Sequence, residues 1–137
     1  MLHQVSIFAA NTKGALSRIT SILARNDINI YTRLATDSAE FGIIRLIVDQ
    51  SEKASEALEK EGYQCRVDLV LAVDMKSDKP GTLDHILSDL QNANVMIRYL
   101  YISFDRQTSS PIAVFSTTES ETEAFLKGKG YHLLDRF

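Results

Sequence analysis

The chain contains an internal repeat, and this repeat limits the possible folds more than any other feature of the sequence. The segment "KGALSRITSILARNDINI", which begins at Lys13, aligns with "PGTLDHILSDLQNANVMI", which begins at Pro80, at a constant shift of 67 residues. Farther along, "EKEGY" aligns with "KGKGY" at a shift of 68 residues, so one residue has been inserted between the two blocks. Self-similarity of this kind indicates that one small structural unit is built twice. The matched positions are Gly14 with Gly81, Leu16 with Leu83, Ile19 with Ile86, Leu23 with Leu90, Ile28 with Val95, Ile30 with Ile97, Gly62 with Gly130, and Tyr63 with Tyr131.

Each repeat begins with a pattern that predicts a strand followed by a helix. Residues 2–9 and 69–75 are short apolar runs, and each is followed by a polar turn that contains a glycine. After the turn, apolar side chains recur at helical spacing, which places them on one face, and we predict that Leu16, Ile19 and Leu23 are buried as are their counterparts in the second repeat. These side chains are Leu16, Ile19, Ile22 and Leu23 in the first repeat, and Leu83, Ile86, Leu87 and Leu90 in the second.

A hairpin, a second helix and a final strand are predicted to complete each repeat. β-Branched and aromatic residues favour strand pairs at 28–36 with 41–49 and at 95–103 with 111–117, joined by the polar turns 37–40 and 105–110. Second helices are predicted over 51–61 and 120–129, with exits at Gly62 and Gly130, and Ser120 with Glu123 fits a capping box. The final strands are predicted at 63–67 and 131–135.

This order of elements predicts an α+β protein made of two ferredoxin-like βαββαβ units. In such a unit the antiparallel sheet carries both helices on one face. The predicted boundaries are 1–68 and 69–137. The stretch from Tyr63 to Asp74 contains no linker of Gly, Pro or Ser, so we expect the units to be packed together rather than tethered.

Composition and charge argue against several classes of function. The net charge is −3 and the basic residues form no run, which argues against binding of nucleic acid. The apolar stretches are too short to cross a membrane, and no signal peptide is recognised, so the expected location is the cytoplasm. His3, His85, His132 and Cys65 lack metal-ligand spacing, and no phosphate-binding loop occurs. We therefore expect no catalytic activity, no metal and no cofactor.

The two junctions between the first strand and first helix resemble those of the ACT domain family, in its stand-alone tandem form. The resemblance rests on "NTKGALSRITSILARNDINI" and "DKPGTLDHILSDLQNANVMI" and extends over nearly the whole chain. It implies small regulatory modules that bind an amino acid. In this family the loop between the first strand and first helix commonly contacts that ligand at an interface between two ACT units.

The chemistry of the junctions supports the same site. A glycine before a helix lets the backbone approach a ligand closely, and the free N–H groups of the first turn favour a carboxylate. The side chains of Asn11 and Asp78, or the carbonyls near Asn29 to Tyr31, would accept hydrogen bonds from an ammonium group. The candidate ligand-binding residues are Asn11, Lys13, Gly14, Ala15, Leu16, Asn29, Ile30, Asp78, Pro80, Gly81, Thr82 and Leu83.

The same residues also have purely structural interpretations. Gly14 and Gly81 fit tight turns, and Asn11 and Asp78 fit strand ends or helix caps. Lys13 fits a solvated side chain, since Pro80 occupies its place in the second repeat.

The sequence therefore predicts a non-catalytic regulator whose ligand is a free amino acid. The alternative is an accessory or oligomerisation subunit that regulates a partner enzyme by protein contact and binds no ligand. Exposed edge strands such as "YLYIS" favour self-association, so a homodimer is expected in either case.

Overall fold

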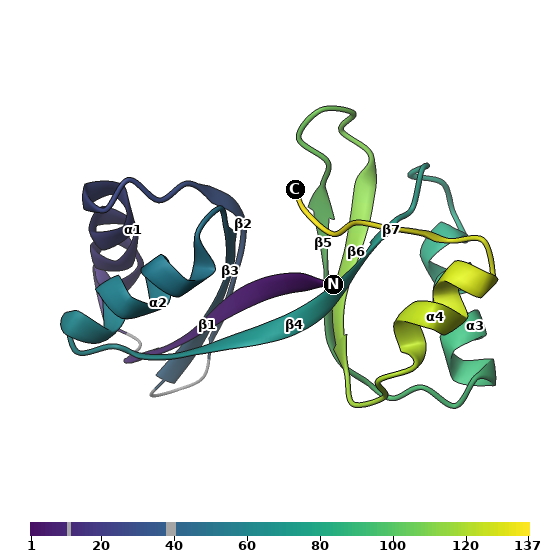
Figure 1. Ribbon diagram of the computed structural model, residues 1–137, viewed down its shortest axis with the longest axis horizontal. Helices are drawn as coiled ribbons and strands as arrows, with labels where there is room; N and C mark the ends of the chain where they lie inside the picture. Colours follow the sequence, from purple (N-terminus) through teal and green to yellow (C-terminus); the bar gives the residue numbers. More distant parts are fainter. Residues whose placement is uncertain (11, 38–40) are drawn as a thin grey trace. The chain divides into compact units, whose positions relative to one another are not determined.

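A computed structural model describes residues 1–10, 12–37 and 41–137. It contains two compact units, and both are drawn in Figure 1. The N-terminal unit is His3–Asp68, and the C-terminal unit is Leu69–Phe137 together with Met1–Leu2. No helix in the described residues is long and apolar enough to span a membrane.

The N-terminal unit is a sheet with two helices on one face (Figure 1). Its strands lie in the order β2-β3-β1-β4, and β3 is antiparallel to both β1 and β2. Its elements follow one another as β1 (Leu2–Ala10), α1 (Ala15–Arg25), β2 (Ile30–Asp37), β3 (Phe41–Val48), α2 (Ser51–Lys60) and the first residues of β4 (Gln64–Asp74).

The C-terminal unit repeats this arrangement with the last residues of β4 as its opening strand. Strand β6 is antiparallel to β4 and β5, and β7 pairs with the other side of β4. The remaining elements are α3 (Thr82–Asn92), β5 (Ile97–Phe104), β6 (Pro111–Thr117), α4 (Thr122–Gly128) and β7 (His132–Leu133). The predicted fold class, two ferredoxin-like βαββαβ units, is confirmed.

Each of the helices α1 to α4 is followed closely by one residue with a positive φ, which turns the chain back toward the sheet. These residues are Asp27 (58°), Gly62 (91°), Asn94 (59°) and Gly130 (90°). The N–H of the next residue then bonds to a carbonyl five positions earlier, as in the Schellman motif. The pairs are Ile28 with Leu23, Tyr63 with Leu58, Val95 with Leu90, and Tyr131 with Leu126. The residue after each turn packs against the core of its own unit.

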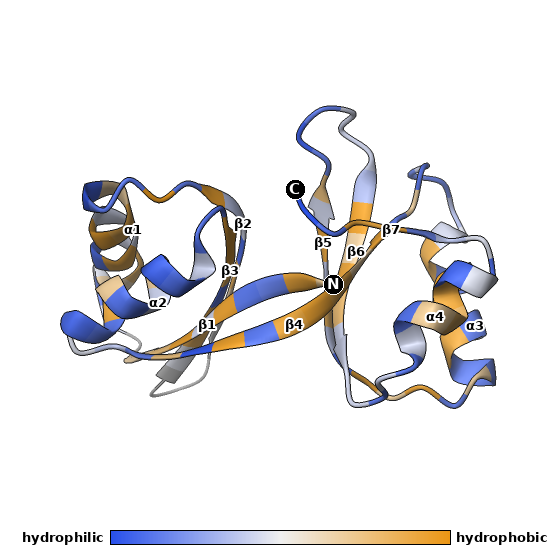
Figure 2. Cartoon of the chain, viewed as in Figure 1, coloured by the Kyte–Doolittle hydropathy of each residue, from blue (hydrophilic) through white to orange (hydrophobic). Residues whose placement is uncertain are grey.

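Each unit has its own hydrophobic core between sheet and helices. Figure 2 shows helices that carry both hydrophobic and hydrophilic residues, as expected when only one face is buried. In the N-terminal unit, Ile19, Leu23 and Leu58 are fully buried against β1 and β3 residues. In the C-terminal unit, Ile86 and Leu90 occupy the places of Ile19 and Leu23.

The prediction that Leu16 is buried is wrong, because its side chain is 41% exposed. Its counterpart Leu83 is half-buried. Both lie in the first turn of a helix, and the next turn supplies the buried residues Ile19 and Ile86. Spacing places Leu16 on the apolar face of the helix but does not show how much of that face is covered at the first turn.

Two other sequence predictions need correction at the strands. The final strand of the first repeat and the opening strand of the second form one strand, β4, since no break separates 63–67 from 69–75. The last strand of the chain is shorter than the predicted 131–135, although the Leu134 N–H still donates to the Ala72 carbonyl at 2.9 Å. Most of the predicted turn 37–40 lies outside the described residues.

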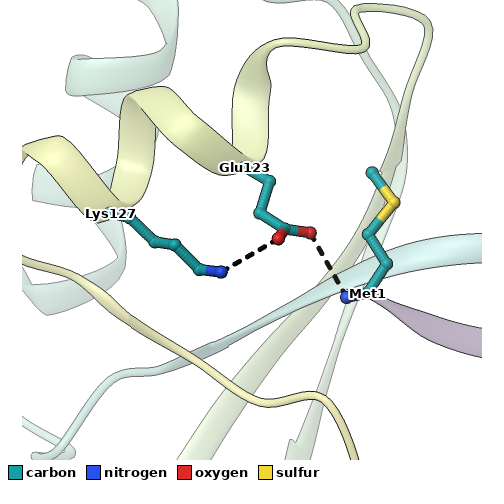
Figure 3. A network of polar contacts seen from close by, with 3 residues as sticks. All are labelled: Met1, Glu123 and Lys127. Carbon is teal, nitrogen blue, oxygen red and sulfur yellow. Dashed lines mark hydrogen bonds and ion pairs between the residues drawn. The ribbon is translucent and has the colours of Figure 1, made fainter.

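The predicted capping box of Ser120 and Glu123 is also wrong. Helix α4 begins later than predicted, at Thr122, and its N-cap Glu121 makes no side-chain capping bond. The Glu123 carboxylate instead accepts from Lys127 Nζ at 2.9 Å and from the Met1 ammonium at 3.2 Å (Figure 3). These two donors lower the pKa of Glu123 from its usual value, with Lys127 the stronger.

The difference between Leu16 and Leu23 is testable by matched truncations. We expect Leu23→Ala to lower the free energy of unfolding by about 2–5 kcal/mol, because it opens a cavity in the N-terminal core. We expect Leu16→Ala to cost less than about 1 kcal/mol, since its side chain is largely exposed. Urea unfolding followed by circular dichroism measures both, and equal losses would contradict the burial described here.

Candidate functional site

The second strand-to-helix junction is a long loop that is anchored by Asp74. Strand β4 ends at Asp74 and α3 begins at Thr82, which leaves the seven residues 75–81 between them. Asp74 Oδ1 accepts hydrogen bonds from the Lys76 N–H at 2.8 Å and from Ser110 Oγ at 2.6 Å. The Met75 N–H donates to the Pro111 carbonyl at 2.9 Å. The start of the loop is therefore held against β6 and the turn before it.

Gly81 ends this loop as the N-cap of α3, with φ of 91°. A left-handed φ disfavours residues with a β-carbon. A β-carbon at Gly81 would meet no atom of the described residues within 4 Å, so the space beside this backbone is open. In the first turn, the Thr82 N–H donates to the Lys79 carbonyl at 3.2 Å and the His85 N–H to the Gly81 carbonyl at 2.9 Å.

The N–H groups of Leu83 and Asp84 remain without an acceptor in the described part of the chain. The first N–H groups of any helix lack partners inside that helix, and they attract anions together with the helix dipole. The junction thus offers two backbone donors next to an open glycine.

A cavity of about 500 Å³ lies at this junction. It extends from the end of β4 across the loop and the start of α3 to the turn before β7. Its volume falls within the range typical of small-molecule sites. The lining residues are Asp74, Met75, Lys76, Lys79, Pro80, Gly81, Thr82, His85, Ile86, Gly130, Tyr131 and His132.

One wall of the cavity is fixed by a polar cluster. The Tyr131 hydroxyl donates to Asp89 Oδ2 at 2.6 Å, and His85 Nε2 lies 3.7 Å from the same oxygen. The rings of His85 and Tyr131 are 6.3 Å apart between centroids. Burial and the bond to Asp89 raise the pKa of Tyr131 from its usual value of 10.0 to about 12, so its hydroxyl keeps its proton into alkaline solution.

The first junction is shorter and is covered by an arginine. Strand β1 ends at Ala10 and α1 begins at Ala15, which leaves only the four residues 11–14. Gly14 has φ of 84°, but a guanidinium nitrogen of Arg18 lies 3.6 Å from the place of its missing β-carbon. The other terminal nitrogen of Arg18 donates to Thr12 Oγ1 at 3.3 Å. Arg18 therefore borders the space beside Gly14, whereas no described atom lies within 4 Å of the same place at Gly81.

The family described as an ACT domain pair matches residues 1–130. The chain belongs to this family. Comparison with curated protein sequences gave no match.

Among solved structures, the ACT pair is similar to protein BT0572 from Bacteroides thetaiotaomicron. That similarity has a TM-score of 0.85 and 29% identity, and it covers 97% of this chain and 91% of the other. The ligand-free regulatory subunit of aspartate kinase from Thermus thermophilus matches with a TM-score of 0.70 and 14% identity, over 93% of this chain and 90% of that one. The corresponding subunit from Thermus flavus matches with a TM-score of 0.67 and 15% identity, over 91% and 88%. At these lower identities the likeness concerns the fold.

The structure of this ACT pair brings together only some of the residues proposed from sequence. Pro80, Gly81 and Thr82 line the cavity, whereas Asp78 and Leu83 do not contribute to its lining. In the first junction Lys13 and Leu16 are exposed and Ala15 is half-buried. Asn11 lies outside the described residues.

Asn29 and Ile30 lie at the other end of the N-terminal sheet from Gly14. Ala10 pairs with Phe41 at the start of β3, and Ile30 pairs with Val48 at its end. Seven steps along a strand span roughly 24 Å. The Asn29 backbone is already used, because its N–H donates to Asp49 Oδ1 at 3.0 Å and its carbonyl accepts from the Asp49 N–H at 3.2 Å. Within one unit, therefore, no small ligand contacts both sets.

Sequence reasoning missed the residues that build the walls of the cavity. These are Asp74, Lys76, Lys79, His85, Tyr131 and His132. A signal existed for two of them: Tyr131 follows the helix-ending Gly130, and His85 lies one helical turn after Gly81 on the same side of α3. Asp74 carried no such signal, since its role depends on Ser110 in a distant turn.

The bond between Tyr131 and Asp89 predicts a difference between the two repeats. We expect Tyr131→Phe to lower the free energy of unfolding by about 1–3 kcal/mol, because Asp89 loses a donor. Tyr63→Phe is the matched control, since Ile22 occupies the place of Asp89 there, and we expect it to be nearly neutral. Urea unfolding at pH 7 measures both.

The pH dependence has a defined sign. The pKa of Tyr131 is raised in the folded protein to about 12, so its contribution is complete below about pH 10 and is lost between about pH 10 and 12. Wild-type protein should lose more stability over that range than Tyr131→Phe. Equal losses for the two proteins would show that the pKa of Tyr131 is not raised by folding.

Proposed function

We propose that this ACT domain pair is a non-catalytic regulatory protein that binds a free amino acid. Residues 1–68 and 69–137 are the two ACT-like domains in this proposal, and the ligand lies at a strand-to-helix loop and an interface between ACT units. Family membership supports a regulatory, ligand-binding role. The Thermus neighbours, described as regulatory subunits of aspartate kinase, support control of a partner enzyme. A cytoplasmic location also belongs to the proposal.

The open cavity beside Gly81 is the observation that carries this function. An amino acid has a carboxylate and an ammonium group close together, so its site needs donors next to acceptors. In this proposal Lys79 and the Thr82 hydroxyl, both of which line the cavity, serve the carboxylate. Asp74, which lines the cavity and is half-buried, serves the ammonium. Met75 and Ile86 supply apolar surface for a side chain.

A panel of the twenty free amino acids, read by thermal unfolding, tests this proposal. A ligand that binds only the folded state stabilises it by about 2.7 kcal/mol at a concentration of 100 Kd. For a protein of this size we expect a rise in Tm of several degrees with one amino acid or a few related ones. No shift with any amino acid would contradict the proposal and favour the accessory-subunit alternative.

The site within the fold is tested by Gly81→Val. The new side chain would enter the open space beside the loop, and we expect the thermal shift to be abolished. Gly62→Val is the matched control, because Gly62 also has φ of 91° with no described atom within 4 Å of an added β-carbon. Both variants carry the same backbone strain, and only Gly81 borders the cavity. Undiminished binding by folded Gly81→Val would remove this loop from the site.

We also propose that the protein is a homodimer that pairs through β5. This strand is last in the order of the C-terminal unit, and it exposes Ile102 (40%) and Phe104 (57%). A bare edge strand with apolar side chains favours pairing with another chain.

Light scattering at micromolar concentration tests the homodimer, with an expected mass of twice 15.3 kDa. The Ile102→Lys, Phe104→Lys double variant should shift this mass to that of a monomer. Met96→Lys is the control, since Met96 is 65% exposed and precedes the strand. A monomeric wild-type protein would contradict the proposal.

A further inference from the structure

We infer that only the C-terminal junction of each chain binds the ligand, and that Arg18 keeps the N-terminal junction closed. This inference rests on the proposed function and predicts one ligand per chain despite two repeats. The two junctions differ in the length of the loop, in the residue one turn after the glycine, and in the wall beside them.

The first difference is the length of the loop. Seven residues connect β4 to α3, and only four connect β1 to α1. The longer loop includes Lys76, whose backbone has a positive φ of 61°, and both Met75 and Lys76 line the cavity. In the first repeat the corresponding residues, Phe8 and Ala9, belong to β1, which continues up to Ala10.

The second difference is the residue one turn after each glycine. In α3 this residue is His85, whose side chain is 74% exposed and leaves the space beside Gly81 open. In α1 it is Arg18, whose guanidinium lies over Gly14 and donates to Thr12. A ligand that approached Gly14 would have to displace this guanidinium.

The third difference is the wall. Tyr131 is held by Asp89 in the C-terminal unit, whereas Tyr63 faces an α1 surface on which Ile22 replaces that aspartate. A hollow of about 290 Å³ does lie near Tyr63 along α1, and its lining includes Arg18 and Ile22 but not Gly14. The N-terminal unit thus keeps the glycine and the tyrosine without the polar cluster between them.

The position of Arg18 has an electrostatic consequence. The amino end of a helix carries a partial positive charge, so a guanidinium there is not favoured by the helix itself. At this position the guanidinium donates to Thr12 Oγ1 at 3.3 Å. A free carboxylate near Gly14 would pair with Arg18 rather than with the backbone. The experiment must therefore distinguish an Arg18 that blocks the junction from an Arg18 that binds the ligand.

Isothermal titration calorimetry on the full chain tests the inference, with the amino acid that gives the largest thermal shift as the probe. We expect one equivalent per chain for wild-type protein and for Gly14→Val, and no binding for Gly81→Val. Arg18→Ala should add a second, weaker equivalent and change the Kd of the first by less than about twofold. Arg25→Ala, which removes another exposed arginine of α1, should remain at one equivalent.

Several outcomes would overturn the inference. Two equivalents in wild-type protein would show that both junctions bind. Loss of the single equivalent in Arg18→Ala or in Gly14→Val, but not in Gly81→Val, would place the ligand in the N-terminal unit. One equivalent in Arg18→Ala would show that Arg18 is not what closes the first junction. Absence of heat with every amino acid would instead contradict the proposed function.

Discussion

The left-handed residue at the end of each helix determines where the following strand begins. At these four places the chain leaves its helix, bonds back to the last turn through its backbone and packs the next side chain against the core. In α4 this residue is Gly130, and the side chain that follows is Tyr131. The cavity wall therefore depends on a backbone turn as much as on the tyrosine. A residue that could not adopt this φ would displace Tyr131 from Asp89 and move β7 away from β4.

The fold was predictable because the information that specifies it is local and appears twice. Apolar spacing marked the helices, and Gly62 and Gly130 marked their exits. Each helix or strand assigned in one repeat was then supported by the matching assignment in the other repeat. Errors arose where the outcome depended on neighbours. Leu16 matches the helical pattern, but the pattern does not show that its side chain is left largely exposed. The capping box failed because Glu123 finds stronger cationic donors, Lys127 and the Met1 ammonium, one of them 122 positions away in sequence.

The site was only partly predictable, for a related reason. A strand-to-helix junction with a glycine is visible in sequence, and Pro80, Gly81 and Thr82 do border the cavity. The opposite walls come from β7 and the end of β4, and no sequence spacing connects those segments with the junction. The alignment of the two repeats also predicted a ligand site at both glycines, Gly14 and Gly81. Only the arrangement of Arg18 and the length of each loop separate an open junction from a covered one.

Strand β4 has a consequence for how this protein can be dissected. Its first residues complete the order β2-β3-β1-β4 in one unit, and its last four pair with β6 in the other, while the boundary between the units falls at 68/69 inside the strand. A cut at this boundary severs a hydrogen-bonded strand rather than a loop. Each product would then have a frayed chain end at the place where its sheet needs an ordered strand. The halves are thus poor candidates for separate expression. A flexible spacer inserted there would itself disturb the sheet of each unit, so it would not serve as a neutral means of separating them.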